Sequence, residues 1–304
     1  SIDDQGKPEQ SEKAATKLTS DASVVAILGA SASTRSLAIA PIAQKHEIPM
    51  ITPSSTNPKV TRAGDYIFRT CFIDDFQGAV MARFVRKTLK AGKVAILRDL
   101  GSEYSVGLAQ YFKEKFGSLG GKIVADEAYK EGDVDFKPQL KAIRPLHADL
   151  IYVPGYYTDV ANIVSQARKL GIKAIFAGGD GWDSNELYKI GESSSEASYF
   201  TNHYAPNSKD PVHVKFVGEY KAKYKVSPNA DAALGYDAAM VLFDAMKRAK
   251  SPSGPDLREA IAHTKNFPGV TGSITLDEMR NAVKPVVIFK VQGKKADYIQ
   301  TINP

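Results

Sequence analysis

Carboxylate, phenol and hydroxyl side chains recur where apolar runs of this chain end, which is where binding or reacting groups are expected. Asp180 follows the run AIFAGG and stands between Gly179 and Gly181, with Trp182 next. No Lys or Arg is adjacent to Asp180 in sequence. Glycines at such a place allow a tight turn or the close approach of another group. The lone carboxylate is therefore either a turn residue or a binding site for a positive charge.

Small hydroxyl residues follow two other apolar runs, VVAIL and PMITP. They are Ser31, Ser33, Thr34, Ser54, Ser55 and Thr56. Hydroxyls beside the free backbone N–H groups of a helix N-terminus form an anion site. Capping of the next helix by Ser33 or Thr34 explains part of the same pattern, and so does a turn that ends at Asn57.

Tyrosines follow two further runs: Tyr104 comes after VAILRDL, and Tyr156 and Tyr157 come after LIYVP. A single tyrosine in such a place more commonly packs than binds. An acid with aromatic neighbours suits an ammonium group by charge pairing and cation–π contact, whereas the hydroxyls suit a carboxylate. Together these groups match the zwitterionic head of an α-amino acid.

The elements that position these residues alternate between short apolar runs and amphipathic segments. We expect strands at 23–30, 48–53, 65–70, 93–100, 122–129, 148–155 and 172–179, and helices at 34–47, 76–92, 104–120, 136–143 and 159–170. The strands are apolar throughout and recur after roughly 25 residues, which favours parallel sheets covered by helices on both faces. After residue 210 the order changes to three helices and a hairpin that turns at Gly293. The pattern predicts two α/β lobes.

Length and composition limit the classes of function. A chain of 304 residues favours two domains over one. The net charge is +6, but the chain has no basic run of five or more residues, so we do not expect a nucleic-acid partner. One cysteine, Cys71, excludes an internal disulfide and a cysteine-based metal site. No apolar run approaches the length of a membrane span.

Signals of catalysis are weak. The chain has no G-x-S-x-G, no G-x-x-x-x-G-K-[ST] and no H-E-x-x-H motif. The five histidines are dispersed, so we expect no metal site. Asp180 as a general acid or base would need a second titrating partner, and the strand ends offer only tyrosines. We expect a binding protein without a cofactor rather than an enzyme.

The chain resembles the branched-chain amino-acid-binding proteins of bacterial ABC importers, which have the type I periplasmic (Venus-flytrap) fold. The resemblance covers nearly the whole chain and is carried by DDQGKPEQSEKAATKL, GASASTRSLAIAPIAQKHEIPMITPSSTNP, YIFRTCFIDDFQG, VAILRDLGSEYSVGLAQYFKEKFGSLGGKIV, DFKPQLKAIRPLHADLIYVPGYYTD, IVSQARKLGI and AALGYDAA, in family order. It implies two doubly wound parallel-sheet lobes joined by three crossovers, with residues 1–74 and 204–281 in lobe one and 75–203 and 282–304 in lobe two. It also implies a periplasmic or extracellular monomer that captures an amino acid between the lobes and delivers it to a membrane permease.

The resemblance assigns roles to particular residues. Carboxylate-binding positions fall on Ser33, Ser54 and Thr56, and ammonium-binding and closing positions fall on Tyr104, Tyr156 and Asp180. Ser31 and Asp231 stand where branched-chain binders tend to have apolar residues. Asp231 is equally explained as the N-cap of a helix that starts at Ala232. Trp182 and Tyr204 are candidates for an aromatic wall.

Two questions stay open at this point. If Ser31 and Asp231 face the ligand, burying unpaired polar groups costs about 1–3 kcal/mol, and a polar or cationic amino acid rivals an aliphatic one. The same fold also serves as an amino-acid or amide sensor in signalling proteins. Family members begin about 45 residues earlier, and Ile2 reads as the tail of a strand, so we expect upstream strands of lobe one and a signal peptide.

Overall fold

The computed structural model describes residues 1–205 and 208–304, and the chain forms two compact units. Unit 1 comprises residues 1–73 and 203–285 together with Pro304, and unit 2 comprises residues 74–202 and 286–303. From the sequence, we expected the chain to cross from one lobe to the other at residues 74/75, 203/204 and 281/282. The last change falls four residues later, after Pro285, because Ala282 packs in a core cluster of unit 1 and Lys284 donates a hydrogen bond to Thr271 of that unit.

Unit 1 contains a parallel sheet whose two faces are both covered. Its strands are β1 (Ile27–Leu28), β2 (Met50–Thr52) and β3 (Ile67–Arg69), in the order β1-β2-β3. Met50 and Ile67 pack on one face with α1 (Pro8–Thr19), α2 (Ser33–Lys45) and α3 (Lys59–Arg62). Ile51 and Phe68, one residue further along each strand, pack on the other face. The side-chain period of two in a strand produces this division.

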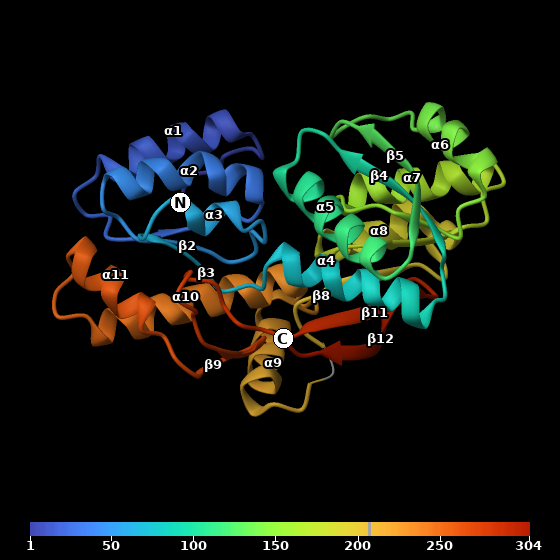
Figure 1. The fold of residues 1–304 in the computed structure, drawn as a ribbon. Coiled ribbons are helices and arrows are strands. Elements are labelled where there is room, and N and C mark those ends of the chain that lie inside the picture. Colours follow the sequence, from blue (N-terminus) through green and yellow to red (C-terminus); the bar gives the residue numbers. More distant parts are fainter. Residues whose placement is uncertain (206–207) are drawn as a thin grey trace. The chain divides into compact units, whose positions relative to one another are not determined.

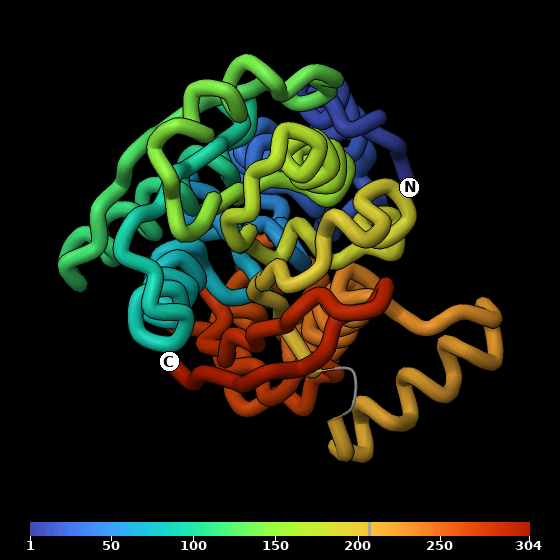
Figure 2. Tube along the Cα trace, turned by 90° about the vertical axis from the view of Figure 1, so that its right-hand side faces the viewer, coloured from blue at the N-terminus to red at the C-terminus, as the bar shows by residue number. Residues whose placement is uncertain are grey.

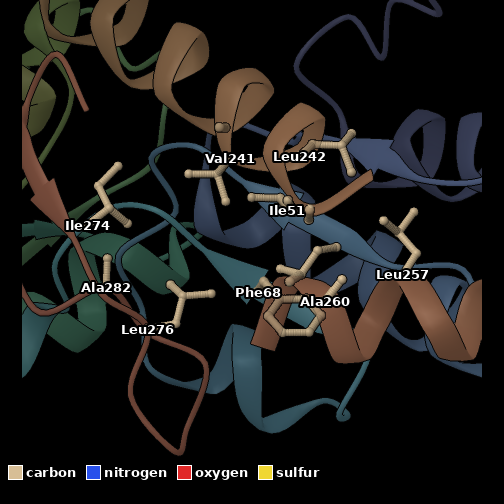
Figure 3. Packing of buried hydrophobic residues seen from close by; sticks show 12 residues of the cluster. Ile51, Phe68, Val241, Leu242, Leu257, Ala260, Ile274, Leu276 and Ala282 are labelled. Carbon is tan, nitrogen blue, oxygen red and sulfur yellow. The ribbon is translucent and has the colours of Figure 1, made fainter. Parts of the chain in front are cut away.

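The second face of this sheet is covered by α10 (Ala230–Arg248) and α11 (Gly254–Ala262). Figure 3 shows Val241 and Leu242 of α10 and Leu257 of α11 gathered around Ile51 and Phe68. The small hairpin of β9 (Phe267–Gly269) and β10 (Gly272–Ile274) contributes Ile274 to the same cluster. α10 and α11 contribute seven of the twelve buried residues of this cluster.

α9 (Pro211–Tyr224) lies at the periphery of unit 1 and leads into α10, as Figure 2 shows. Phe216 anchors α9 in a small separate cluster with Tyr204, Ala233 and Val270. Ile2, which the sequence suggested as the tail of a strand, lies instead in the irregular segment before α1. A strand forms only when a neighbouring strand satisfies its backbone, and none of the described strands pairs with Ile2.

Unit 2 contains a seven-stranded sheet in the order β12-β11-β8-β7-β6-β4-β5. Its strands are β4 (Lys93–Asp99), β5 (Lys122–Tyr129), β6 (Leu150–Tyr152), β7 (Ile175–Gly178), β8 (Tyr199–Asn202), β11 (Val286–Gln292) and β12 (Lys295–Ile302). β4 to β8 run parallel, and the β11–β12 hairpin adds antiparallel to β8. The expected doubly wound α/β class is confirmed, with an antiparallel hairpin at one edge.

Helices cover both faces of this sheet (Figure 1). α4 (Asp74–Arg83), extended by a π-helical turn at Phe84–Thr88, packs with α5 (Glu103–Ser118), whereas α6 (Lys137–Ile143), α7 (Tyr157–Lys169) and α8 (Asn185–Gly191) belong to the other face. From β4, the chain first passes through α5 to β5 on one side of β4. It then returns to the other side, where β6, β7 and β8 follow, so the strand order reverses between β4 and β6. Such a switch point leaves a crevice at the carboxyl ends of the two strands, where α/β proteins bind ligands.

Candidate functional site

The switch point of unit 2 carries Tyr104, Tyr156 and Asp180 together. Tyr104 is the second residue of α5 after β4, Tyr156 directly precedes α7 after β6, and Asp180 follows β7. The Tyr104 hydroxyl donates a hydrogen bond of 2.8 Å to Asp180 Oδ1, and the rings of Tyr104 and Tyr156 lie 5.3 Å apart between centroids. The structure therefore brings together all three residues that the sequence singled out for the ammonium group.

The protonation of Tyr104 follows from its surroundings. Burial, together with the nearby carboxylates of Asp180 and Asp74, raises the pKa of the Tyr104 phenol well above its ordinary value. The phenol therefore stays protonated at neutral pH and donates to Asp180. It also accepts a hydrogen bond of 3.2 Å from the backbone N–H of Gly181. This fixed donor holds one carboxylate oxygen of Asp180 in a defined direction.

A residue that the sequence did not reveal, Gln77 of α4, holds the backbone of the same loop. Its side-chain Oε1 accepts hydrogen bonds from the Asp180 backbone N–H at 3.0 Å and from Thr201 Oγ1 at 2.5 Å. Gln77 is fully buried. A buried amide requires partners. Its Nε2 donates to the nearby Asp74, but the two partners of its oxygen lie 103 and 124 residues away, in the loop after β7 and in β8, so the sequence around Gln77 does not identify them.

The glycines around Asp180 are explained by close approach. A Cβ atom added to Gly179 would collide with the Tyr104 hydroxyl, and one added to Gly178 would collide with the indole of Trp182. Trp182 itself is fully buried, stacks on Phe200 and donates from Nε1 to the carbonyl of Val153 at 2.9 Å. Trp182 thus fills the core of unit 2 and does not form the aromatic wall suggested for it, because its polar atom and both neighbours are core groups.

Unit 1 gathers the hydroxyl residues at the carboxyl ends of β1 and β2. Ser31 and Ser54 share a hydrogen bond of 2.8 Å between their hydroxyls, and Ser54 Oγ also donates to the Ser31 carbonyl at 3.0 Å. The buried Ser33 Oγ accepts from the Asn57 backbone N–H at 3.1 Å. Thr56 Oγ1 is buried and has no hydrogen-bond partner within the protein. A buried hydroxyl without a partner is available to a ligand oxygen.

The helix after β1 is not capped as the sequence suggested. Its N-cap is Ala32, and no side chain makes a capping hydrogen bond there. Ser33 is the first helical residue and its hydroxyl points to the neighbouring loop, where it holds Asn57. Capping by Ser33 or Thr34 is therefore wrong, because the helix starts one residue earlier than a serine cap requires. The first-turn N–H groups of α2 stay without a side-chain cap, as at an anion site.

Arg69 organises the Ser54–Asn57 segment and was also missed in the sequence. Its guanidinium is fully buried and donates to the carbonyls of Ser55 at 2.5 Å and Asn57 at 2.8 Å, and to Thr61 Oγ1 at 3.2 Å. An arginine inside the apolar run YIFRT is a detectable signal, because a buried cation must find acceptors. Its effect is to turn these carbonyls inward, away from any ligand of the loop.

Two further candidates, Asp231 and Tyr204, lie at or beside α9 and α10 of unit 1. Asp231 is exposed on the first turn of α10, whose N-cap is Asn229, since the Asn229 side chain accepts from the Ala232 backbone N–H at 3.0 Å. The N-cap explanation of Asp231 is therefore wrong: the helix starts at Ala230. Tyr204 is buried against α9, and its hydroxyl donates to the Pro228 carbonyl at 3.2 Å, so it packs in unit 1.

Within residues 1–205 and 208–304, no group of three or more His, Cys, Asp or Glu is arranged to hold a metal ion. No helix among these residues is long and apolar enough to cross a bilayer. The groups collected at the strand ends are hydrogen-bond donors in unit 1 and a carboxylate with two phenols in unit 2. Donors of this kind suit a carboxylate, and a carboxylate with phenols suits an ammonium group.

Folds and sites of this kind define periplasmic solute-binding proteins, and the chain belongs to the periplasmic binding protein family, which it matches over residues 1–296. It is 43% identical to the leucine-binding protein LivK of Thermotoga maritima, whose crystal structure superposes with a TM-score of 0.97 over 100% of this chain and 87% of that one. It is 32% identical to LivJ of Streptococcus pneumoniae, crystallised with isoleucine, and that structure superposes with a TM-score of 0.93 over 100% of this chain and 86% of that one. A Leu/Ile/Val-binding protein homologue of Brucella abortus is 30% identical over 98% of this chain and 81% of its own length. The resemblance expected from the sequence is confirmed.

Proposed function

We propose that this chain is the solute-binding component of an ABC importer and that it captures a free branched-chain or other aliphatic amino acid. The observation that carries the proposal is the hydrogen bond between Tyr104 and Asp180 at the switch point of unit 2. It presents an oriented carboxylate beside two aromatic rings, which suits an ammonium group. The names of the relatives, which include leucine and isoleucine binders, agree with this choice.

The carboxylate of the amino acid would be held by the hydroxyl groups of unit 1. Thr56 supplies a buried hydroxyl without a protein partner; Ser54 lies on the same loop after β2, and Ser33 is the first residue of α2 after β1. The uncapped N-terminus of α2 adds backbone N–H groups with a favourable dipole. The two units would thus carry the two charges of the zwitterion, and we propose that they are the two lobes of a periplasmic binding protein.

The same proposal includes three further points. The protein delivers its ligand to a membrane permease, it is located outside the cytoplasm, and it is not an enzyme. Their support is the names of the relatives, which are amino-acid-binding proteins, one of them the substrate-binding protein of a branched-chain amino acid transporter. A polar or cationic amino acid is the alternative, since Ser31 and Asp231 are both exposed polar residues. Ser31 is already hydrogen-bonded to Ser54, which favours the aliphatic ligand.

A thermal-shift panel over the twenty amino acids tests the proposal. A ligand that binds only the native state raises the melting temperature by mass action. We expect the largest shifts with L-leucine, L-isoleucine and L-valine, followed by titration calorimetry of the strongest. Larger shifts with arginine or serine would favour the alternative. An absence of shift with every amino acid would refute the proposed function.

A further inference from the structure

Positive charge is concentrated at the end of the unit 2 sheet where the parallel strands begin. Four segments run there from the last turn of a helix to the first residue of the next strand, and we call them together the amino edge: residues 85–93, 115–122, 140–150 and 166–175. They contain eleven Lys and Arg residues and one carboxylate. The amino edge therefore has a net charge of +10, whereas the whole chain has +6.

Most of these cations are not used within the protein. Arg86, Lys115 and Arg168 are half-buried, and the other eight are exposed. Within residues 1–205 and 208–304, none of the eight exposed cations forms an ion pair. The single carboxylate, that of Asp149, accepts hydrogen bonds of 2.8 Å from the backbone N–H groups of Gly92 and Lys93. The positive charge is thus directed to the surroundings of the protein.

The requirements of folding explain only part of this charge. Cations in the last turn of a helix are stabilised by the helix dipole, which accounts for Lys87, Lys141 and Lys169. Lys93 and Lys122, by contrast, are the first residues of β4 and β5 and are direct partners across the two strands. Like charges on facing positions of neighbouring strands destabilise a sheet. This pair therefore indicates a role outside the fold itself.

A pocket of about 380 Å³ opens in the amino edge, between the turn before β6 and the turn before β7. Its exposed cationic lining comes from Arg144, His147 and Lys173, of which the histidine is charged only when protonated. Its buried apolar lining consists of three isoleucines, Ile143, Ile151 and Ile172. Leu146 stands in the turn between Arg144 and His147 and is 39% exposed. Cations above an apolar floor suit an anionic group that is attached to hydrocarbon.

The composition of the amino edge favours a lipid surface over a nucleic acid. Single-stranded nucleic acids bind to proteins through aromatic side chains that stack on the bases. The one Phe, Tyr or Trp residue of the four segments is Phe116, which is fully buried. An anionic bilayer needs no stacking partner, because clustered Lys and Arg residues near its surface are sufficient for attraction.

We propose that the amino edge of unit 2 binds the surface of an anionic phospholipid bilayer, with a headgroup phosphate at the pocket and Leu146 at the interface. Tyr104 and Tyr156 follow the carboxyl ends of β4 and β6, at the opposite end of the same parallel strands, so lipid at the amino edge leaves them uncovered. The inference goes beyond the proposed function and does not require it. For a solute-binding protein, such contact would raise its concentration at the membrane that holds the permease.

Flotation of the protein with unilamellar vesicles tests the proposal. We expect the wild type to float with vesicles of phosphatidylcholine and phosphatidylglycerol, and to stay in solution with vesicles of phosphatidylcholine alone. Binding should disappear at about 0.5 M salt, because exposed charges are then screened within a few ångströms.

A triple variant of Lys93→Gln, Lys122→Gln and Lys173→Gln removes three exposed cations of the amino edge. One Lys near an anionic surface strengthens partitioning by about 5-fold. The triple variant should therefore bind the phosphatidylglycerol vesicles about 10- to 100-fold more weakly than the wild type. Its affinity for L-leucine and its melting temperature should stay near those of the wild type, which shows that the fold and the carboxyl end of the sheet are intact.

The matched control is the triple variant Lys7→Gln, Lys13→Gln and Lys17→Gln. These lysines are also exposed, but they lie in and just before α1 of unit 1. The change in net charge is the same in both triple variants, so the control separates the position of the charge from its amount. We expect the control variant to bind the vesicles as the wild type does.

An environment-sensitive dye on an introduced cysteine reports which end of the sheet meets the lipid. The native Cys71 is buried, so a dye attached to the folded protein marks the new position. We expect phosphatidylglycerol vesicles to shift the emission of the dye to the blue in Leu146→Cys. No shift is expected in Val134→Cys, which is 84% exposed in the loop after the carboxyl end of β5.

Four results would overturn the inference: equal binding to both kinds of vesicle, equal losses in the two triple variants, a blue shift in Val134→Cys but not in Leu146→Cys, or tighter binding to a DNA duplex than to the anionic vesicles. A complete absence of leucine binding would refute the proposed function instead. The vesicle results would be unaffected by it, because flotation needs no amino acid.

Discussion

Replacing Asp180 by asparagine should remove the charge of the proposed ammonium site while keeping its shape. The amide oxygen can still accept the hydrogen bond of 2.8 Å from Tyr104, and the backbone bond to Gln77 is unaffected. A hydrogen bond to a charged group contributes about 1.5–3 kcal/mol. We therefore expect D180N to weaken leucine binding by about 10- to 150-fold.

The neighbouring variant Tyr104→Phe separates charge from orientation. It removes a neutral donor that directs Asp180 and the acceptor of the Gly181 N–H. Because Tyr104 acts on the ligand only through the direction of the Asp180 carboxylate, the loss should be smaller than in D180N, about 0.5–1.5 kcal/mol, and the affinity should fall by about 2- to 13-fold. D180N should thus be the more damaging of the two variants, although it changes fewer contacts.

Titration calorimetry with L-leucine at pH 7.5 measures both variants, with thermal melting to confirm that each is folded. Asp183→Asn is the matched control, because Asp183 follows the same short helical turn, whereas the Tyr104 hydroxyl donates to Asp180. We expect D183N to bind as the wild type does. Wild-type affinity of D180N, or a larger loss in Y104F than in D180N, would refute the assignment of Asp180 to the ammonium group.

Three further predictions concern the supporting structure. The methyl group of Gly179→Ala should clash with the Tyr104 hydroxyl, which lowers stability by about 1–3 kcal/mol and weakens leucine binding. Gly117→Ala in α5 is the control: an added Cβ meets open space there, so this variant should be neutral or stabilising by up to about 1 kcal/mol. Thermal melts and calorimetry compare the two variants. Arg69→Met should leave the loop carbonyls buried without donors and destabilise the protein by about 2 kcal/mol or more; urea unfolding that matches the wild type would contradict this. Asp159 has a folded-state pKa of about 6 against an ordinary value of 3.8, so its contribution to stability is complete below about pH 4 and is lost as the pH rises through 6. At pH 8, D159N should therefore be more stable than the wild type by up to about 3 kcal/mol and melt at a higher temperature, and this difference in stability should shrink towards pH 4. A difference that does not change with pH would show that the charge of Asp159 is not its cause.

The sequence by itself identified the α/β class, most of the elements and the residues of unit 2's switch point. Apolar runs of strand length at a regular spacing define buried parallel strands, and β5 was located at 122–129 as found. Polar residues directly after such runs must lie at one edge of the sheet. For this reason Asp180, Tyr104 and Tyr156 could be grouped before any contact between them was known, and their proximity in the structure agrees.

Weakly patterned elements were missed for a physical reason. β8 (Tyr199–Asn202), β9, β10 and α8 are short segments of three to seven residues. Too few residues are present in them for a period of two or 3.6 to stand out, and their formation depends on neighbours elsewhere in the chain. β1 was expected over eight residues and has two, because a strand extends only as far as a partner pairs with it.

The tertiary structure alone decided which candidate residues are exposed and which fill the core. Trp182 and Tyr204 have the chemistry of a binding wall, but their polar atoms are bonded to the carbonyls of Val153 and Pro228 inside their own units. Gln77 and Arg69 were not singled out from the sequence, although Arg69 stands inside an apolar run, yet they hold the two loops that carry the proposed ligand groups. Local sequence determines which groups a loop offers, whereas long-range hydrogen bonds and packing determine which of them reach a ligand.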